Sequence, residues 1–292
     1  MSPQVATLIT GTLTTGAILS LLSVGFVIMY RATKVVSFAQ GAFSLLGGFT
    51  FMALTQDGTG LWLALVITLV VALAAGMVTY LVVFVRLVGA EPFITAIATI
   101  GLGTLIEACA IIAWGSGPII LPTVISGRVY HLTGSLTVSV TQIFIVVSAI
   151  VIFAVVITAL RRTRLGLRVQ AVADQPRLAA YVGINVVAIT TLAWAVSSAT
   201  AAVGGVAFLL TTQPSPDSVY SLGLVVFPAI LLGGLDSVGG ALVGGILLAF
   251  IQNLVITYAN GTWQDVTSYG LLLLVLLIRP QGLFGSAEVS RV

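Results

Sequence analysis

Charged residues are scarce in this chain: Asp, Glu, Lys and Arg make up 7% of its 292 residues, whereas soluble domains carry about 25%. Hydrophobic residues make up 59%, and the mean hydropathy is +1.21. These values exclude a soluble globular domain and indicate that lipid surrounds most of the chain. Cysteine is nearly absent too, and the single Cys109 excludes an intrachain disulfide and a zinc cluster. Because Cys109 lies in an apolar run, we expect it to be a small buried hydrophobic residue.

The motifs of the common catalytic sites are also missing. The sequence has no Gly-x-Ser-x-Gly, His-Glu-x-x-His or Cys-x-x-Cys, and no phosphate-binding loop that ends in Gly-Lys-Ser/Thr. The single histidine, His131, has no second metal ligand at a suitable spacing. We therefore expect no metal, no cofactor and no enzymatic activity in this chain. Any energy from ATP must come from another subunit.

Long apolar runs recur from end to end. They lie at 5–29, 35–55, 61–85, 92–114, 140–160, 187–210, 222–235, 238–258 and 265–278. A helix needs about 20 apolar residues to cross the hydrocarbon core, so two of these runs are short for a crossing. We predict an all-α polytopic membrane protein, with residues 1–292 forming a single transmembrane permease domain of about eight or nine helices. The first run lacks the flanks of a signal peptide and is expected to be retained.

Basic residues predict the orientation, because Lys and Arg are enriched in cytoplasmic loops. Placing Arg31 and Lys34 inside puts the N-terminus outside. Alternation then places Arg86 inside, the loop 115–139 outside and the loop 161–186 inside. The external loop is rich in turn-forming and β-branched residues, which is typical of a small hairpin.

The C-terminal basic residues decide how the last apolar runs divide. Arg279 and Arg291 favour a cytoplasmic C-terminus, which requires an odd number of crossings from an external N-terminus. We therefore predict that 222–235 is a helix of its own and is not merged with 238–258.

Glycines interrupt the apolar runs in both halves of the chain. Residues 231–245 read Leu-Leu-Gly-Gly-Leu-Asp-Ser-Val-Gly-Gly-Ala-Leu-Val-Gly-Gly, and residues 37–43 read Ser-Phe-Ala-Gln-Gly-Ala-Phe. Interrupted helices in both halves indicate a substrate pathway between two structural repeats, and the repeat itself is a hypothesis. The glycines predicted to permit breaks or close helix packing are Gly41, Gly47, Gly48, Gly233, Gly234, Gly239, Gly240, Gly244 and Gly245.

Few polar groups lie at membrane depth, where a charge costs about 2.5 to 3.5 kcal/mol. Glu107 can carry a coupling ion or form a hydrogen bond between helices. Asp236 can line a pathway or cap the helix that starts near Val238. Gln40 can bind a passing solute or link two helices. The candidate residues of a translocation path are Ser37, Phe38, Gln40, Phe43, Glu107 and Asp236.

Residues 161–185 form the extended polar stretch of the chain and hold five of its eleven basic residues. Between 167 and 182, small and apolar residues alternate with charges, which predicts a short helix whose alanine face lies in a groove of a partner. Pro176 suits the first turn of such a helix. The candidate contact residues are Arg164, Gly166, Arg168, Ala171, Asp174, Arg177, Ala179 and Gly183.

Four blocks in this order resemble one family of transport proteins. Residues 33–48 are similar to the family's Asn-Phe-Ala-His-Gly block, and residues 91–115 are similar to its fourth-helix block, with Ala-Thr-Ile-Gly-Leu at 98–102. Residues 162–185 resemble its cytoplasmic loop, and residues 228–285 resemble its C-terminal block up to Arg-Pro-Gln-Gly-Leu-Phe-Gly. The chain thus resembles the first of the two permease subunits of branched-chain amino acid ABC importers of bacteria.

The resemblance implies a cytoplasmic-membrane importer with a second, homologous permease, two cytoplasmic ABC ATPase subunits that use ATP, and an external solute-binding protein. It implies lipid but no nucleic acid as a further partner. The basic loop would be the coupling helix that sits in an ATPase groove. Ser37 and Gln40 stand where the family usually has Asn and His, and Ala42 where an acid is common. These differences leave the substrate open between branched-chain amino acids and related small polar solutes.

An alternative remains open at this point. An ion-coupled secondary transporter or a facilitator would work alone, with Glu107 as its essential carboxylate. An intramembrane enzyme would need a catalytic cluster that His131, Glu107 and Asp236 cannot form. A structural scaffold is disfavoured, because broken helices at membrane depth are tolerated only when they are buried in protein or line a cavity.

Overall fold

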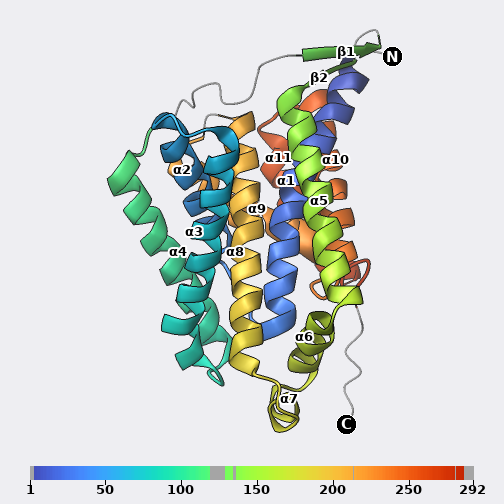
Figure 1. The fold of residues 1–292 in the computed structure, drawn as a ribbon. Helices are drawn as coiled ribbons and strands as arrows, with labels where there is room; N and C mark the ends of the chain where they lie inside the picture. The colour runs from blue at the N-terminus through green and yellow to red at the C-terminus, as the bar shows by residue number, and fades with distance from the viewer. Residues whose placement is uncertain (1–2, 119–128, 134–135, 213, 280, 286–292) are drawn as a thin grey trace.

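In the part of the chain that it describes, a computed structural model shows a bundle of nine helices arranged around α1 (Figure 1). It describes residues 3–118, 129–133, 136–212, 214–279 and 281–285. The helices of the bundle are α1 (Pro3–Thr33), α2 (Gln40–Gln56), α3 (Leu61–Val82), α4 (Pro92–Trp114), α5 (Val140–Arg162), α8 (Val186–Thr211), α9 (Pro216–Gly233), α10 (Val238–Tyr258) and α11 (Trp263–Ile278). Seven of these described helices, all except α2 and α11, are long and apolar enough to cross a membrane. The prediction of an all-α polytopic membrane protein is confirmed.

The centre of the bundle is α1, which packs against α5, α8, α9 and α10. Its most apolar stretch is 89% buried, and Leu21, Leu22 and Phe26 are fully enclosed. In contrast, the corresponding stretches of α3, α4 and α5 are only 22%, 17% and 22% buried. These three helices therefore form the outside of the bundle, where many of their Ile, Leu and Val side chains are exposed.

The first of the two predicted interruptions is a broken crossing, although its non-helical residues contain no glycine. After α1 ends, residues 34–39 are not helical, and α2 begins at Gln40. The side-chain amide of Gln40 donates to the backbone carbonyl of Leu22. Leu22 lies eleven residues before the end of α1, or about 16 Å along the helix axis. Residues 34–39 thus run from the end of α1 back into the bundle, and α2 forms only the part of the crossing that lies beyond them. The hydroxyl of Thr99 accepts from the Phe38 amide at 3.0 Å, which satisfies a backbone donor inside the bundle.

The second interruption separates α9 from α10. Gly234 has a φ of 105°, which glycine adopts without strain, and Ser237 caps α10 by accepting from the amide of Gly240. The predicted run 222–235 therefore lies largely in a helix separate from α10, as predicted, although α9 begins at Pro216 and ends at Gly233. After α11, the amides of Leu283 and Phe284 donate to carbonyls at the end of α9. The described part of the chain accordingly starts at one end of the bundle and finishes at the other (Figure 1).

Most of the predicted packing glycines lie where a side chain would clash. Added Cβ atoms would meet the backbone or side chains of neighbouring helices at Gly41, Gly47, Gly48, Gly233, Gly240, Gly244 and Gly245. Helices α2, α8, α9 and α10 approach closely at these positions. Gly239 differs, because nothing lies within 4 Å of its added Cβ. A packing role for Gly239 is therefore wrong.

Short elements complete the two ends. The strands β1 (Val129–Thr133) and β2 (Leu136–Ser139) form an antiparallel hairpin, as expected for part of the loop 115–139. Residues 119–128 of that loop lie outside the described residues. At the opposite end lie the 3-10 helix η1 (Phe84–Leu87) and two short helices, α6 (Arg164–Asp174) and α7 (Pro176–Tyr181). His131 belongs to β1, and Cys109 is exposed on α4, so the expectation that Cys109 is buried was wrong.

Candidate functional site

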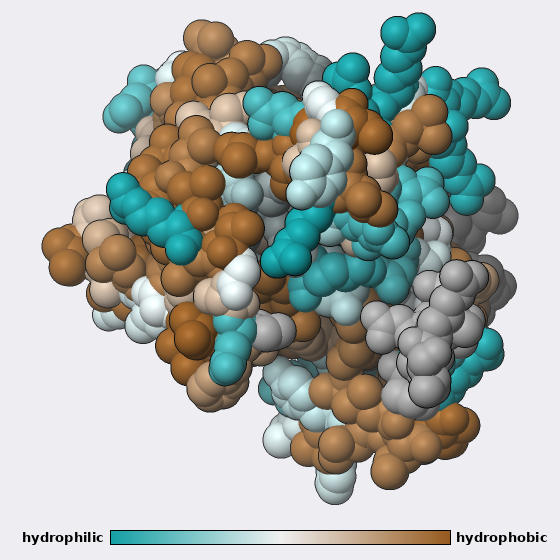
Figure 2. All heavy atoms as spheres, turned by 90° about the horizontal axis from the view of Figure 1, so that it is seen from below, coloured by the Kyte–Doolittle hydropathy of each residue, from teal (hydrophilic) through white to brown (hydrophobic). Residues whose placement is uncertain are grey.

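Basic residues gather at one end of the bundle, the lower end in Figure 1. All nine basic residues that the structure describes lie there: Arg31, Lys34, Arg86, Arg161, Arg162, Arg164, Arg168, Arg177 and Arg279. The other two, Arg128 and Arg291, lie outside the described ranges. Figure 2 looks onto this end and shows hydrophilic side chains among apolar ones. The predicted basic loop, the end of α1 and the turn between α9 and α10 thus share one surface.

The basic loop folds as two helices with a break at Pro176. The proline is the first residue of α7, as predicted, and the helix ends before Gly183, whose φ is 83°. On the inner side, Val169, Val172 and Ala179 form an apolar cluster with Ile189 of α8. These contacts fix α6 and α7 to the base of the bundle.

The faces of α6 and α7 differ from the predicted arrangement. Ala179 is buried, and Gly166 lies against the backbone of Leu160 at the end of α5. Ala179 of the predicted alanine face therefore packs inward, whereas Ala180 is exposed. The exposed candidates are Arg164, Arg168, Asp174, Arg177 and Gly183, whereas Ala171 is half-buried.

Large apolar side chains on the exposed side were missed from the sequence. Leu167, Leu178, Tyr181 and Val182 are 70%, 56%, 87% and 75% exposed. They stand beside the exposed arginines on two short helices fixed to the bundle. An exposed apolar group with a charged surround is typical of a protein contact. The pattern that could have revealed them is the spacing of Leu178, Tyr181 and Val182, which places them on one face of a helix.

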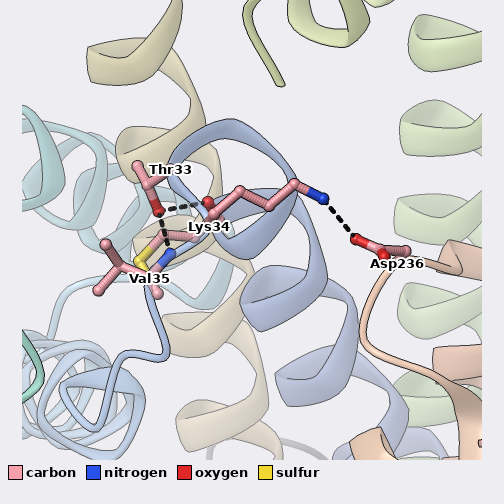
Figure 3. A network of polar contacts seen from close by, with 5 residues as sticks. Thr33, Lys34, Val35 and Asp236 are labelled. Atoms are coloured by element: carbon pink, nitrogen blue, oxygen red, sulfur yellow. Dashed lines mark hydrogen bonds and ion pairs between the residues drawn. The ribbon is translucent and has the colours of Figure 1, made fainter. Parts of the chain in front are cut away.

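An ion pair joins two distant segments at the same end. The Nζ of Lys34 lies 3.1 Å from the Oδ1 of Asp236 (Figure 3), and so connects the end of α1 with the turn between α9 and α10. Lys34 has a φ of 55°, and the hydroxyl of Thr33 accepts from the Val35 amide beside it. Asp236 is part-exposed at the end of the bundle, and Ser237 caps α10. The interpretation of Asp236 as the cap of α10 was therefore wrong, and its place in a translocation path stays a prediction.

Gln40 is fully enclosed in the middle of the bundle. Its amide nitrogen donates to the carbonyl of Leu22 at 3.2 Å, and its Oε1 accepts from the hydroxyl of Ser197 at 3.1 Å. It thereby connects α1, α2 and α8. Of the two predicted roles, linking helices is the one that these contacts display.

The neighbouring path candidates are also enclosed or packed. The hydroxyl of Ser37 accepts from the Ala39 amide inside the bundle. The ring of Phe38 stacks on that of Phe227, with centroids 4.9 Å apart. Phe43 is buried with its ring against Trp194. These residues form a packed layer in the middle of the helix bundle.

Glu107 lies elsewhere, in a polar cluster between α4 and α9. Its carboxyl is within hydrogen-bonding reach of Asp217 in the first turn of α9. Nearby, the side chain of Tyr220 lies close to that of Thr104. The cluster is close to the end of the bundle that is opposite the basic surface, so the structure does not bring Glu107 together with Gln40 or Asp236.

Two cavities approach the packed layer from opposite ends. The cavity at the N-terminal end has a volume of about 430 Å³, and no charged residue lines it. Its lining includes Thr14, Gln142, Gln252 and Gln264. The cavity at the basic end, of about 290 Å³, has Trp194 and residues of α6 and α7 in its wall. The two cavities share no lining residue, and the contacts of Gln40 lie between them along both α1 and α8.

Metal ligands do not gather in the described residues: no group of three His, Cys, Asp or Glu side chains could hold an ion.

Comparison with known proteins identifies close counterparts of the whole chain. Residues 8–276 match the family model described as "Branched-chain amino acid transport system / permease component". The high-affinity branched-chain amino acid transport system permease protein LivH of Escherichia coli (strain K12) is 29% identical, over 96% of this chain and 95% of LivH. BraD of Pseudomonas aeruginosa, which has the same description, is 30% identical over the same shares.

A more distant relative carries a different description. The fructose import permease protein FruF of Bifidobacterium longum is 23% identical, over 85% of this chain and 70% of FruF. No solved structure matches the chain significantly.

Proposed function

The chain belongs to the family of branched-chain amino acid transport permeases, and from this premise we propose that it forms the membrane path of a bacterial ABC importer for branched-chain amino acids or related small polar solutes. The family match over residues 8–276 is the observation that carries the proposal. The uncharged cavity at the N-terminal end, lined by hydroxyl, amide and aliphatic groups, supports it, because such a lining suits a small solute without net charge.

The orientation follows from the basic residues. Lys and Arg mark the cytoplasmic side of a membrane protein, and the described ones share the end that holds α6 and α7. We place this end in the cytoplasm, the beginning of the chain outside and the C-terminal segment inside the cell. The protein then lies in the cytoplasmic membrane with its uncharged cavity open to the exterior.

Helices α6 and α7 are the proposed contact with the ATPase subunits. Their exposed Arg177, Leu178 and Tyr181 offer a charged and apolar surface. Their inner faces pack on α8 and on the end of α5. A movement of the ATPases would therefore be transmitted to the helices of the bundle.

The remaining partners complete the importer. The chain lacks a phosphate-binding loop, so ATP hydrolysis is assigned to two partner ATPases, and no cofactor is assigned to this chain. A second, homologous permease would cover part of the apolar outside formed by α3, α4 and α5, and lipid would cover the rest. An external solute-binding protein would deliver the substrate at the end opposite α6 and α7.

The experiment is a mild-detergent purification of the chain from its native membranes, followed by mass spectrometry of the proteins that co-purify. The importer predicts recovery of an ABC ATPase and a second permease. A solute-binding protein captured with them can be tested for binding of leucine, urea and aromatic acids. Recovery of the chain alone or as a homo-oligomer would contradict the importer and favour a transporter that works by itself.

A further inference from the structure

A third cavity opens at the basic end, between α1, α5, α6 and the start of α10. Its volume is about 460 Å³, which is large enough for the headgroup of a phospholipid. Its polar lining includes Arg31, Arg161, Gln170 and Ser237. It contributes nothing to the path or to the exposed contact surface of α7, and its chemistry differs from both.

The charge in this cavity is positive. Arg31 and Arg161 both line it. No described carboxylate lies within 4 Å of either guanidinium group, and the ion pair found among the described residues joins Lys34 to Asp236. Asp236 also lines the cavity, and Lys34 compensates its charge. Two guanidinium groups without carboxylate partners are suited to a phosphate, which they bind through paired N–H donors.

The start of α10 adds backbone donors to the arginines. The amide of Gly240 is already bonded to the hydroxyl of Ser237, and that of Ala241 to its carbonyl. The amides of Val238 and Gly239, which also line the cavity, precede the first intrahelical bond. The positive end of this 21-residue helix therefore supports an anion that the arginines hold.

The rest of the lining indicates an amphiphile. Ile157 and Leu160 of α5 and Leu167 of α6 form an apolar wall beside the arginines. Arg31 and Arg161 lie in the last turns of two membrane helices, α1 and α5, which places the cavity at the level of the lipid headgroups. Basic hollows between membrane helices at this level are suited to anionic lipids.

We propose that this cavity binds the headgroup phosphate of an anionic phospholipid, with its glycerol and upper acyl chain against Ile157 and Leu167. The lipid would connect α6 with α1 and α10, so it would hold the coupling helices against the bundle. The binding stands on the geometry of the cavity. Its effect on coupling rests on the proposed function.

The test measures lipid binding by native mass spectrometry of the purified complex, after exchange into phosphatidylcholine with added phosphatidylglycerol. The double variant Arg31→Gln/Arg161→Gln should bind phosphatidylglycerol roughly thirtyfold more weakly, given the combined contribution of two basic residues near an anionic surface. Arg31→Lys/Arg161→Lys keeps both charges and should retain most of the binding. Arg86→Gln is the matched control, because Arg86 lies at the same end but outside the cavity.

Several outcomes would overturn the proposal. Equal retention of phosphatidylglycerol in the wild type and the double glutamine variant would do so. So would displacement of the lipid by millimolar inorganic phosphate, which would assign the site to a free anion. Because the readout needs neither ATP nor substrate, an importer that fails in transport can still pass this test. If the complex transports solute but the wild type binds no phosphatidylglycerol in this cavity, the lipid proposal fails and the proposed function stands.

Discussion

At the scale of single residues, Lys34 and Asp236 connect the end of α1 with the turn between α9 and α10. The pair is 3.1 Å apart, and its side chains are 49% and 32% exposed. Water and salt screen such a pair, so its direct contribution to stability is at most about 1 kcal/mol. The ion pair acts mainly by positioning the α9–α10 turn, which it holds beside Arg31 and Arg161.

Reversing one charge of this pair tests that role. Asp236→Lys should reduce uptake, because it places two ammonium groups opposite each other. The swap Lys34→Asp/Asp236→Lys should restore it, since Asp tolerates the left-handed backbone at position 34. Solute uptake and thermal unfolding in detergent are the measurements. A swap that transports no better than the single reversal would show that the pair is not what matters there.

Glu107 separates the importer from the ion-coupled alternative. In the importer, Glu107→Gln keeps a hydrogen-bonding partner for Asp217 and should retain most of the uptake. In an ion-coupled transporter, the carboxylate is indispensable and uptake should vanish. Uptake in membrane vesicles decides between them, with Glu91→Gln at the opposite end of α4 as the control. Complete loss in Glu107→Gln alone would count against the importer.

At the scale of elements, α6 depends on a glycine to reach the bundle. A Cβ at Gly166 would meet the backbone of Leu160, so Gly166→Ala should weaken the docking of α6 by about 1–3 kcal/mol, and Gly166→Pro should abolish transport. Both variants should still insert into the membrane. Gly270→Ala is the control, because nothing lies within 4 Å of its added Cβ on α11. Membrane content by immunoblotting and uptake are measured together, and unchanged uptake in Gly166→Pro would discard the coupling role.

The exposed side of α7 offers a second test at this scale. Three substitutions should each reduce co-purification of the ATPase: Arg177→Glu, Asp174→Lys and Tyr181→Ala. Tyr181→Ala should weaken binding of the ATPase by about 2 kcal/mol or more, as is typical of an interface hot spot. Tyr258→Ala alters a tyrosine at the other end of the bundle that is 60% exposed and should have no effect. Full recovery of the ATPase by all three loop variants would place the ATPase contact elsewhere.

The sequence predicted the existence of the helices better than their faces. Each of the nine apolar runs became a helix, because hydropathy over about 20 residues is a local property. The run at 222–235 was predicted too short, since Pro216 and the polar residues after it extend α9 outward, with Ser215 as its cap. Helices that are apolar on all sides do not show from the sequence which side faces inward. For this reason Cys109 was predicted to be buried, although it is exposed.

The contacts between distant segments were beyond the reach of the sequence. Lys34 and Asp236 are 202 residues apart, and nothing local to either one indicates its partner. The inward turn of Ala179 has a similar cause, because it depends on Ile189 and on the position of α8. The separation of α9 from α10 was predictable, because Gly234 and Ser237 act on the adjacent backbone.

At the scale of the whole molecule, the two ends of the bundle differ in chemistry. One end has an uncharged cavity of hydroxyl, amide and aliphatic groups, and the other has all the described basic residues and two short amphipathic helices. The enclosed contacts of Gln40 and Phe43 lie between these ends. This polarity suits a subunit that receives a neutral solute at one side and contacts cytoplasmic subunits at the other.

The most direct test of this account is uptake of labelled leucine by proteoliposomes, made either from the co-purified complex or from this chain alone. We predict uptake by the complex only when ATP faces α6 and α7 and the solute-binding protein faces the other end, with no effect of ionophores. The chain alone should be inactive. Uptake by the chain alone, driven by a proton or sodium gradient, would contradict the account.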